Sequence, residues 1–451
     1  MPRAVLAKVV LQSLAPRLHS LGVELLYCGF EPTPASLSRM HRRLFLTLAA
    51  ASGVLASSSA VADVQPSDML GAAGDSAFLE WLNGFYAREL ASGWSTTVLA
   101  AVLSGLAPDP RVLSSNAGQP EFATPISVYV QNRVTPGAIA VGRRKRDGVA
   151  QLGAIQANYG VPSEVLTSIW SMESGYGANQ GDMDVVRCLA TLAAEDPRRR
   201  AWAENELEAC LKIVASNAAG RAALRGSWAG AMGQTQLIPS TFLSTAVSAS
   251  GRGKPDIWNS SADALASAAN LLMKVGWQRG ESWAVEVTLA PRFDFSLSEG
   301  PKQPPGWWSD KGARRADGQA WSAADTASQG VLLLPSGAGG PAFLAFPNHF
   351  VIRTYNNSLA YALSVGLLAD RIGGAGPLLT PWPKETPLSL EDRMEAQAAL
   401  AKLGYSPGPP DGQIGLGTRQ ALRAWQKERG LPADGYLSPA IVARLRASQK
   451  S

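Results

Sequence analysis

Helical periodicity dominates the middle of this 451-residue chain. Apolar side chains recur there at intervals of three and four residues, the spacing that places them on one face of an α-helix. Strand-like alternation is confined to two short runs, 283–289 and 330–334. The pattern therefore predicts a mainly α fold with few short strands. The expected helices are 149–159, 162–174, 184–194, 199–216, 239–250, 262–276 and 356–372, and helical pattern also runs through part of 64–125.

One of these helices carries an acid on its apolar face. The residues at i, i+4, i+7 and i+8 of that face are Val165, Ile169, Met172 and Glu173. Gly175 is placed to end the helix directly after them. Apolar surroundings and the negative end of the helix dipole both favour a protonated carboxyl, so we expect a raised pKa for Glu173. Such an acid could donate a proton near neutral pH, but a carboxyl that curls out to solvent fits this stretch equally well.

The composition gives little support to other kinds of catalysis. Beyond residue 62 the chain holds two cysteines, Cys188 and Cys210, and one histidine, His349. This set is too small for a Cys/His metal cluster, and His349 would be the only possible base of a Ser-His-Asp triad. The cysteines could form a disulfide in an oxidising compartment or remain separate buried thiols. Carboxylate chemistry is left as the main enzymatic option.

The first 62 residues have the pattern of an export signal. A positive segment begins at Met40, the apolar run 44–55 is too short to span a membrane, and small residues follow up to Ala62. We therefore predict a signal peptide and a periplasmic protein, with the twin-arginine and Sec routes both open. No cysteine lies near the predicted cut, so a lipid anchor is not expected. Most of the net charge of +5 belongs to this leader, which implies no nucleic-acid surface.

A stretch rich in proline and glycine, 373–387, divides the chain and has the composition of a linker. Three short amphipathic segments follow it and predict a small three-helix domain. Their expected N-caps are Ser389 with the help of Asp392, then Thr418, then Ser438. This domain holds no cluster of catalytic residue types, so we interpret it as a binding module.

Two further stretches carry polar groups suited to binding a sugar. The first, 226–242, is rich in glycine and alanine but includes Ser227 and Gln236. The second, RTYNNSLAY, brings three more side chains to a helix start: Tyr355, Asn356 and Tyr361. Tyrosines and amides line many sugar sites. Each signal alone is weak, because an Asn at a helix start is more often a cap and a lone Tyr is more often part of a core.

Four motifs, in their order and spacing, resemble the lytic murein transglycosylases of the B type over about 75–372. They are YGVPSEVLTSIWSMESGYG, DVVRCLATLA, SWAGAMGQTQLIPSTF and RTYNNSLAYALSV. The later stretch GY…DGQIGLGTRQALRAWQKERGLPADG resembles a peptidoglycan-binding domain. The resemblance implies a lysozyme-like α-rich fold that cuts the MurNAc-β-1,4-GlcNAc bond of peptidoglycan without water and needs no cofactor. Glycan strands are then the expected partner, with cell-wall synthesis or division proteins as further candidates.

The resemblance also implies roles for single residues. It assigns the catalytic role to Glu173. The substrate-binding positions that it implies are Ser227, Gln236, Tyr355, Asn356, Tyr361 and, in ISVYVQN, Tyr129. A hydrolase normally uses two carboxyls, whereas one is enough if the sugar supplies its own nucleophile. Hydrolysis of the same bond by Glu173, and wall binding without catalysis, stay open as alternatives.

One loop departs from the family pattern. Relatives often carry an Asp-rich calcium loop where this chain reads AVSASGRGKPDIW, at 246–258. Serines and Arg252 stand at the positions of the expected oxygen ligands, and a positive charge there opposes a hard cation. We therefore expect no bound metal, and expect Asp256 and Asp263 to pair with Arg252 or to cap the next helix.

The predicted order of domains along the chain is an upstream extension 1–39 (untranslated or an N-terminal arm), a signal peptide 40–62, a catalytic domain 63–372, a linker 373–387 and a peptidoglycan-binding domain 388–447.

Overall fold

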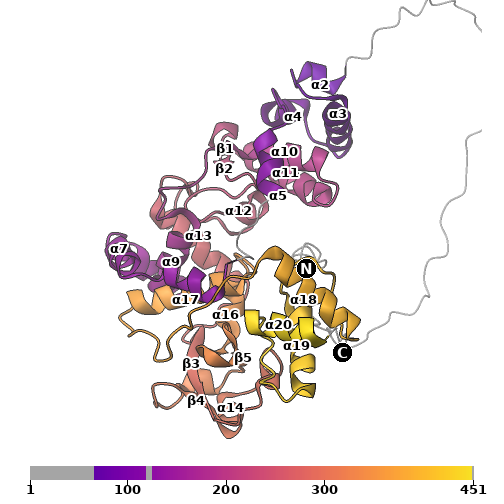
Figure 1. The fold of residues 1–451 in the computed structure, drawn as a ribbon. Coiled ribbons are helices and arrows are strands. Elements are labelled where there is room, and N and C mark those ends of the chain that lie inside the picture. Colours follow the sequence, from indigo (N-terminus) through magenta and orange to yellow (C-terminus); the bar gives the residue numbers. More distant parts are fainter. Residues whose placement is uncertain (1–64, 118–123, 449–451) are drawn as a thin grey trace, which may run out of the picture.

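The computed structural model describes residues 65–117 and 124–448. The predicted upstream extension and signal peptide, 1–39 and 40–62, lie outside the described residues. Figure 1 shows a helical region built on the N-terminal part of the chain, a second helical region in the middle, and a small sheet below it with the C-terminal helices alongside. Within the described ranges, no helix has both the length and the apolar character needed to cross a membrane.

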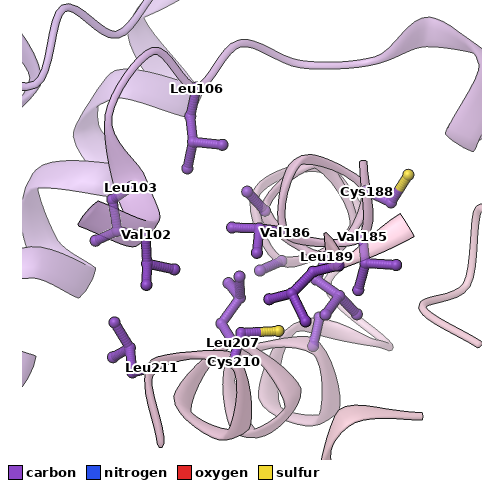
Figure 2. Close-up of a cluster of buried hydrophobic side chains, with 14 of the residues drawn as sticks. Val102, Leu103, Leu106, Val185, Val186, Cys188, Leu189, Leu207, Cys210 and Leu211 are labelled. Atoms are coloured by element: carbon purple, nitrogen blue, oxygen red, sulfur yellow. The ribbon is translucent and has the colours of Figure 1, made fainter. Parts of the chain in front are cut away.

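The first helical region joins segments that are far apart in the sequence. Its helices are α2 (Pro66–Met69), α3 (Ser76–Ala91), α4 (Thr96–Leu103), α5 (Pro110–Ala117), α10 (Val185–Glu195), α11 (Arg200–Ala215) and α12 (Pro239–Thr245). Figure 2 shows part of their shared core, to which α4, α10 and α11 contribute aliphatic side chains. Cys188 and Cys210 lie in this core as free, buried thiols, which excludes the disulfide alternative. Burial raises the pKa of Cys188 to about 12.

The second helical region holds the predicted acid. Its helices are α6 (Ile126–Arg133), α7 (Pro136–Asp147), α8 (Leu152–Tyr159), α9 (Ser163–Ser174), α13 (Ser261–Lys274), α16 (Pro347–Ile352) and α17 (Leu359–Ile372). The apolar faces of α9, α13 and α17 pack together in one core. Tyr355, just before α17, packs against this core and also against the core of the first region. The two regions therefore meet where the sequence predicted binding residues.

A four-stranded antiparallel sheet occupies much of the segment 284–345. Its strands are β3 (Ala284–Leu289), β4 (Ala313–Arg315), β5 (Val331–Leu333) and β6 (Ala342–Ala345), in the order β4-β3-β6-β5, with α14 (Pro305–Asp310), α15 (Ala323–Thr326) and the 3-10 turns Phe295–Leu297 and Gly337–Gly339 between them. The two strand-like runs of the sequence, 283–289 and 330–334, correspond to β3 and β5, whereas β4 and β6 were not predicted. Strand β6 is buried throughout, so its four apolar residues show no alternation to detect. A second, two-stranded sheet pairs β1 (Met183–Asp184) with β2 (Arg225–Gly226), next to the 3-10 turn Arg221–Ala223.

The C-terminal module has the three predicted helices, α18 (Leu390–Lys402), α19 (Leu416–Glu428) and α20 (Pro439–Ser448), around a core that includes Trp425. The capping box of Ser389 and Asp392 is present as predicted. Thr418 is not a cap, because α19 begins at Leu416 and has Gly415 as its N-cap. The Thr418 hydroxyl is buried and donates to the carbonyl of Pro407.

Two helices before the linker are shorter than the pattern predicted. Helix α12 ends at Thr245 instead of 250, because Ala246 already has an extended backbone and begins the loop 246–258. Helix α17 begins at Leu359 instead of 356, because Ser358 is its N-cap and accepts a hydrogen bond from the backbone N–H of Tyr361. Asn356 is therefore not the cap of this helix. Asp184 does cap α10, as the sequence indicated.

Candidate active site

The end of α9 holds Glu173 in a tightly fixed turn. Gly175 ends the helix with φ 57°, the left-handed backbone that glycine adopts without strain. The buried hydroxyl of Ser174 donates to the carbonyl of Gln234 at 2.6 Å and accepts from the N–H of Gly177 at 2.8 Å. Gly177 has φ 83°, and a Cβ there would lie 2.9 Å from the side-chain oxygen of Gln234. The Ser-Gly-Tyr-Gly sequence thus locks the turn that directly follows the acid.

Helix α17 supplies a hydrogen-bond donor to the acid. The hydroxyl of Tyr361 donates to Oε1 of Glu173, across the packed faces of α9 and α17. Tyr361 is only 4% exposed. Burial raises its pKa well above the usual value, and the neighbouring Glu173 raises the pKa further. Tyr361 therefore stays a neutral donor at any physiological pH.

Tyr355 and Tyr129 lie in the same group. Burial, and after it the charge of Glu173, raise the pKa of Tyr355 well above its usual value. Tyr129, on α6, is close enough to Tyr361 to raise that side chain's pKa as well. The guanidinium of Arg133, one turn further along α6, stands 5.4 Å from the ring centroid of Tyr129. The structure therefore brings together the acid and three of the six predicted binding residues.

The other three predicted residues lie on loops. The hydroxyl of Ser227 accepts from the N–H of Ala231 at 3.1 Å and closes a tight turn. Gln236 has φ 52°, and its amide nitrogen donates to the carbonyls of Gln180 and Gly233, at 2.9 Å each. Because Gln180 belongs to the segment after α9, Gln236 ties the 226–242 loop to the segment that follows the acid. Asn356 is partly buried between Tyr355 and the start of α17.

Sequence reasoning missed the aromatic support behind the acid. The rings of Trp170 and Tyr176 meet edge to face, with centroids 5.4 Å apart. The ammonium of Lys145, on α7, stands 5.7 Å from the ring of Trp170 and 5.9 Å from that of Tyr176. Tyr176 has φ 65°, in the left-handed region of backbone conformation that residues with a side chain rarely adopt. The two glycines on either side of Tyr176 were the signal that could have identified this turn.

The lone histidine is not placed to act as a base. His349 is fully buried in α16, and its ring stacks on Trp283 with centroids 6.0 Å apart. Burial lowers the pKa of His349 to about 3. Across 65–117 and 124–448, no three His, Cys, Asp or Glu side chains gather as a metal site would require. Within the described residues, neither a histidine base nor a metal cluster therefore accompanies the carboxyl of Glu173.

The part of the chain before the linker has a lysozyme-like, α-rich fold, in which a helix-end carboxyl meets a group of tyrosines. The chain belongs to the transglycosylase SLT domain family, which matches residues 77–370. The C-terminal module matches the family described as putative peptidoglycan binding domain, over residues 389–445. The resemblance stated from the motifs is thus confirmed for both parts of the chain.

Individual relatives agree with this assignment. Membrane-bound lytic murein transglycosylase B of Escherichia coli is 31% identical over 227 residues, which cover 48% of this chain and 58% of that protein, less than two thirds of its length. The structure of SltB3 from Pseudomonas aeruginosa in complex with NAG-anhNAM-pentapeptide has a TM-score of 0.77 and 43% identity, covering 82% of this chain and all of that one. Slt35 of E. coli in complex with calcium has a TM-score of 0.55 and 25% identity, covering 66% of this chain and 93% of that one.

The carboxyl groups in and beside the 246–258 loop are poorly suited to hold a calcium ion. Both carboxyl oxygens of Asp263 accept backbone N–H groups, from Ala249 and Asp256, at 2.9 Å each. The carboxyl of Asp256 accepts from the N–H groups of Trp258 and Asn259. These contacts, and not the expected pairing with Arg252, hold the loop closed. Carboxylates that face donors in this way have few lone pairs left for a cation.

Proposed function

We propose that this protein is a peptidoglycan lytic transglycosylase. It cleaves the MurNAc-β-1,4-GlcNAc bond non-hydrolytically and leaves 1,6-anhydroMurNAc ends. The observation that carries the proposal is the hydrogen bond from Tyr361 to Glu173, which orients a single carboxyl among tyrosines that suit a sugar. Membership of the transglycosylase SLT domain family supports it, as does the anhydro sugar bound to SltB3.

The proposed reaction uses Glu173 twice. The neutral carboxyl first protonates the glycosidic oxygen, so that the bond to C1 of MurNAc breaks and GlcNAc leaves with a hydroxyl at C4. The N-acetyl group of the substrate helps to hold the positive charge at C1. The carboxylate of Glu173 then removes the proton of the C6 hydroxyl of MurNAc, and O6 bonds to C1. Both reacting groups belong to one sugar, which gives a large intramolecular advantage, and the acid is regenerated without water.

The remaining site residues act on the substrate in this proposal. Tyr129, Tyr355, Tyr361 and Asn356 line the saccharide groove, and Ser227 and Gln236 hold the loop beside the acid. Glycan strands are the partner, and the C-terminal module, matched to the putative peptidoglycan binding domain family, holds the enzyme to the wall. The predicted domain boundaries place catalysis in 63–372 and wall binding in 388–447.

We further propose that the protein acts in the periplasm after export by the signal peptide at 40–62. Murein is its substrate there, and the absence of a cysteine near the predicted cut supports a protein without a lipid anchor. An alkaline phosphatase fusion to residues 1–62 tests this. Periplasmic phosphatase activity supports export, and a replacement of Arg42 and Arg43 by Lys distinguishes the twin-arginine route from Sec.

Product analysis decides between cleavage without water and hydrolysis. Purified sacculi are digested with the enzyme, and the released muropeptides are identified by mass spectrometry. The proposal predicts anhydro products, each one water lighter than the product of a lysozyme-type muramidase. Reducing MurNAc ends would assign the same site to hydrolysis.

A non-catalytic wall-binding protein would release no muropeptides at all. Retention of the Glu173→Gln protein on sacculi, measured by sedimentation, separates binding from cutting. Binding without product from the wild-type protein would favour the scaffold alternative. Binding by the variant, together with anhydro product from the wild type, supports the enzyme.

A further inference from the structure

The segment between the catalytic domain and the C-terminal module is fastened to the catalytic domain. The backbone N–H groups of Leu379 and Thr380 donate to the two carboxyl oxygens of Glu286 on β3, at 2.9 and 2.7 Å. The ring of Trp382 packs against that of Phe343 on β6, with centroids 6.4 Å apart. The composition of 373–387 predicted a linker, and the structure holds this linker along the sheet.

One linker side chain connects the module with the helix that carries Tyr129. Glu385 accepts a hydrogen bond from the hydroxyl of Tyr436 with Oε1, and another from the hydroxyl of Ser127 with Oε2. Ser127 is fully buried in the first turn of α6. Tyr436 belongs to the module and directly follows its Asp434-Gly435 turn. A single carboxylate thus joins residues that are 309 positions apart in the chain.

The hydrogen bond from Ser127 matters because α6 has a weak beginning. Its N-cap is Pro125, which offers no side-chain hydrogen bond to the first turn. Helix α6 packs on α17, which carries Tyr361. The direction of α6 therefore sets where Tyr129 and Arg133 stand relative to the acid.

Two other contacts hold the module in place. The carboxyl of Asp434 accepts from the backbone N–H of Ala338 at 2.9 Å. Glu299 faces Arg419 and Arg423 of α19, with 2.7 Å between a carboxyl oxygen and Nη2 of Arg419. Burial alone would raise the pKa of Glu299, but the two guanidiniums hold it below its usual value. The position of Tyr436 is therefore fixed independently of its bond to Glu385.

We propose that Ser127, Glu385 and Tyr436 are positioning residues, through which the docked C-terminal module sets the place of α6 and of Tyr129 in the saccharide groove. This inference rests on the proposed function, because it concerns the same groove. It gives the module a second task besides wall binding. A simple tether raises the local concentration of enzyme on sacculi but has no effect on how the groove handles a soluble fragment.

The experiment measures kcat and KM on a soluble tetrasaccharide peptidoglycan fragment, with anhydro product detected by mass spectrometry. Ser127→Ala and Tyr436→Phe each remove one hydroxyl, and we expect each to lower kcat/KM about 3- to 10-fold. Because both act through Glu385, the kcat/KM of the double variant is expected to be about the same as that of the less active single variant. Retention of the same variants on sacculi, measured in the Glu173→Gln background, is expected to be unchanged.

A matched control comes from the neighbouring residue. Lys384 is exposed in the same linker, and Lys384→Ala is expected to leave kcat/KM unchanged, whereas Glu385→Ala removes both hydrogen bonds at once. Circular dichroism checks that each variant is folded, and Tyr436→Phe, which deletes one atom from the module, keeps the test available if Glu385→Ala does not fold.

The outcomes separate this inference from the proposed function. If the wild-type protein gives no anhydro product from the fragment, the proposed function fails. If the wild type is active and the losses in Ser127→Ala and Tyr436→Phe simply multiply in the double variant, or if neither variant loses activity, the coupling is overturned and the proposed function stands.

Discussion

Tyr361, in the first turn of α17, donates its hydroxyl to Glu173, in the last turn of α9, although 188 positions separate the two residues. Each helix end is fixed by its own cap, Ser358 for α17 and Gly175 for α9. The carboxyl is therefore oriented by two rigid elements and not by a mobile loop. Proton transfer to a glycosidic oxygen requires such a fixed direction, because the donor must lie within hydrogen-bond reach of the atom that it protonates.

Glu173→Gln is the first prediction. Glutamine has the size of the acid and can accept the hydrogen bond from Tyr361, but it cannot donate and recover a proton. We expect the rate of anhydro product formation to fall about 10³-fold. Mass spectrometry of digested sacculi measures the product, and Glu164→Gln, at the other end of α9, is the matched control. Substantial activity in Glu173→Gln would reject the assignment of the acid.

Tyr361→Phe tests the orienting hydrogen bond. Its loss is expected to lower kcat about 10-fold, because the carboxyl is no longer held in one direction. A donor to a carboxyl favours the ionised form, so its removal is also expected to move the falling limb of the pH–rate profile to higher pH. Tyr405→Phe removes a similar hydrogen bond, from Tyr405 to Glu428 in the module, and serves as the control. An unchanged profile together with an unchanged kcat would leave Tyr361 without this role.

Much of the site could be predicted because its signals are local. An apolar helix that ends on Glu-Ser-Gly is visible within one stretch, and so is the cap at Ser389. The pairing of Glu173 with Tyr361 could not be derived from spacing, since it depends on how α9 packs on α17; only the family resemblance placed both residues in one groove. The expected raised pKa of Glu173 stays a prediction, which the pH–rate profile measures.

The parts that sequence reasoning missed depend on burial and on distant contacts. Strand β6 shows no alternation because both of its faces are covered. Thr418 precedes a helical pattern and looks like a cap, but its hydroxyl is used by the carbonyl of Pro407. Glu385 lies in a stretch with the composition of a linker, and nothing near it in the sequence indicates Ser127 or Tyr436.

The 246–258 loop leads to a prediction about calcium. Because both oxygens of Asp263 accept backbone N–H groups, we expect the melting temperature to be the same in millimolar calcium and in excess EDTA. Asp263→Ala leaves two N–H groups without their acceptor and is expected to cost about 2 kcal/mol of unfolding free energy. Thermal and urea unfolding measure both effects, with Arg252→Ala on the exposed side of the loop as the control. A rise in melting temperature with calcium would show that the loop binds the ion.

Asp370 gives a prediction for the pH dependence of stability. Burial raises its pKa from 3.8 to about 7, although the indole N–H of Trp283 donates to it at 3.0 Å. Between these two pH values the folded protein holds a proton that the unfolded chain has released, so stability falls as the pH rises from 3.8 to about 7. Asparagine stays uncharged at every pH, so Asp370→Asn is expected to flatten the dependence of stability on pH between 3.8 and about 7. Melting temperatures at several pH values check it, with the exposed Asp310→Asn as the control; parallel curves for Asp370→Asn and wild type would contradict it.

Glu299→Gln tests whether the module is held against the catalytic domain by charge. Glu299 is only 14% exposed and faces Arg419 and Arg423, so a neutral amide would leave two guanidiniums without their counter-charge. Loss of these largely buried ion pairs is expected to destabilise the docked position of the module by about 3 kcal/mol and to release the module. Faster cleavage of the 373–387 segment by a protease and a larger radius of gyration in X-ray scattering would report the release, with the exposed Glu391→Gln as the control.

The same variant links docking to activity. Since Tyr436 leaves with the module, activity on the soluble tetrasaccharide should fall as it does in Tyr436→Phe. A released module with full activity on that fragment would show that docking and the groove are independent.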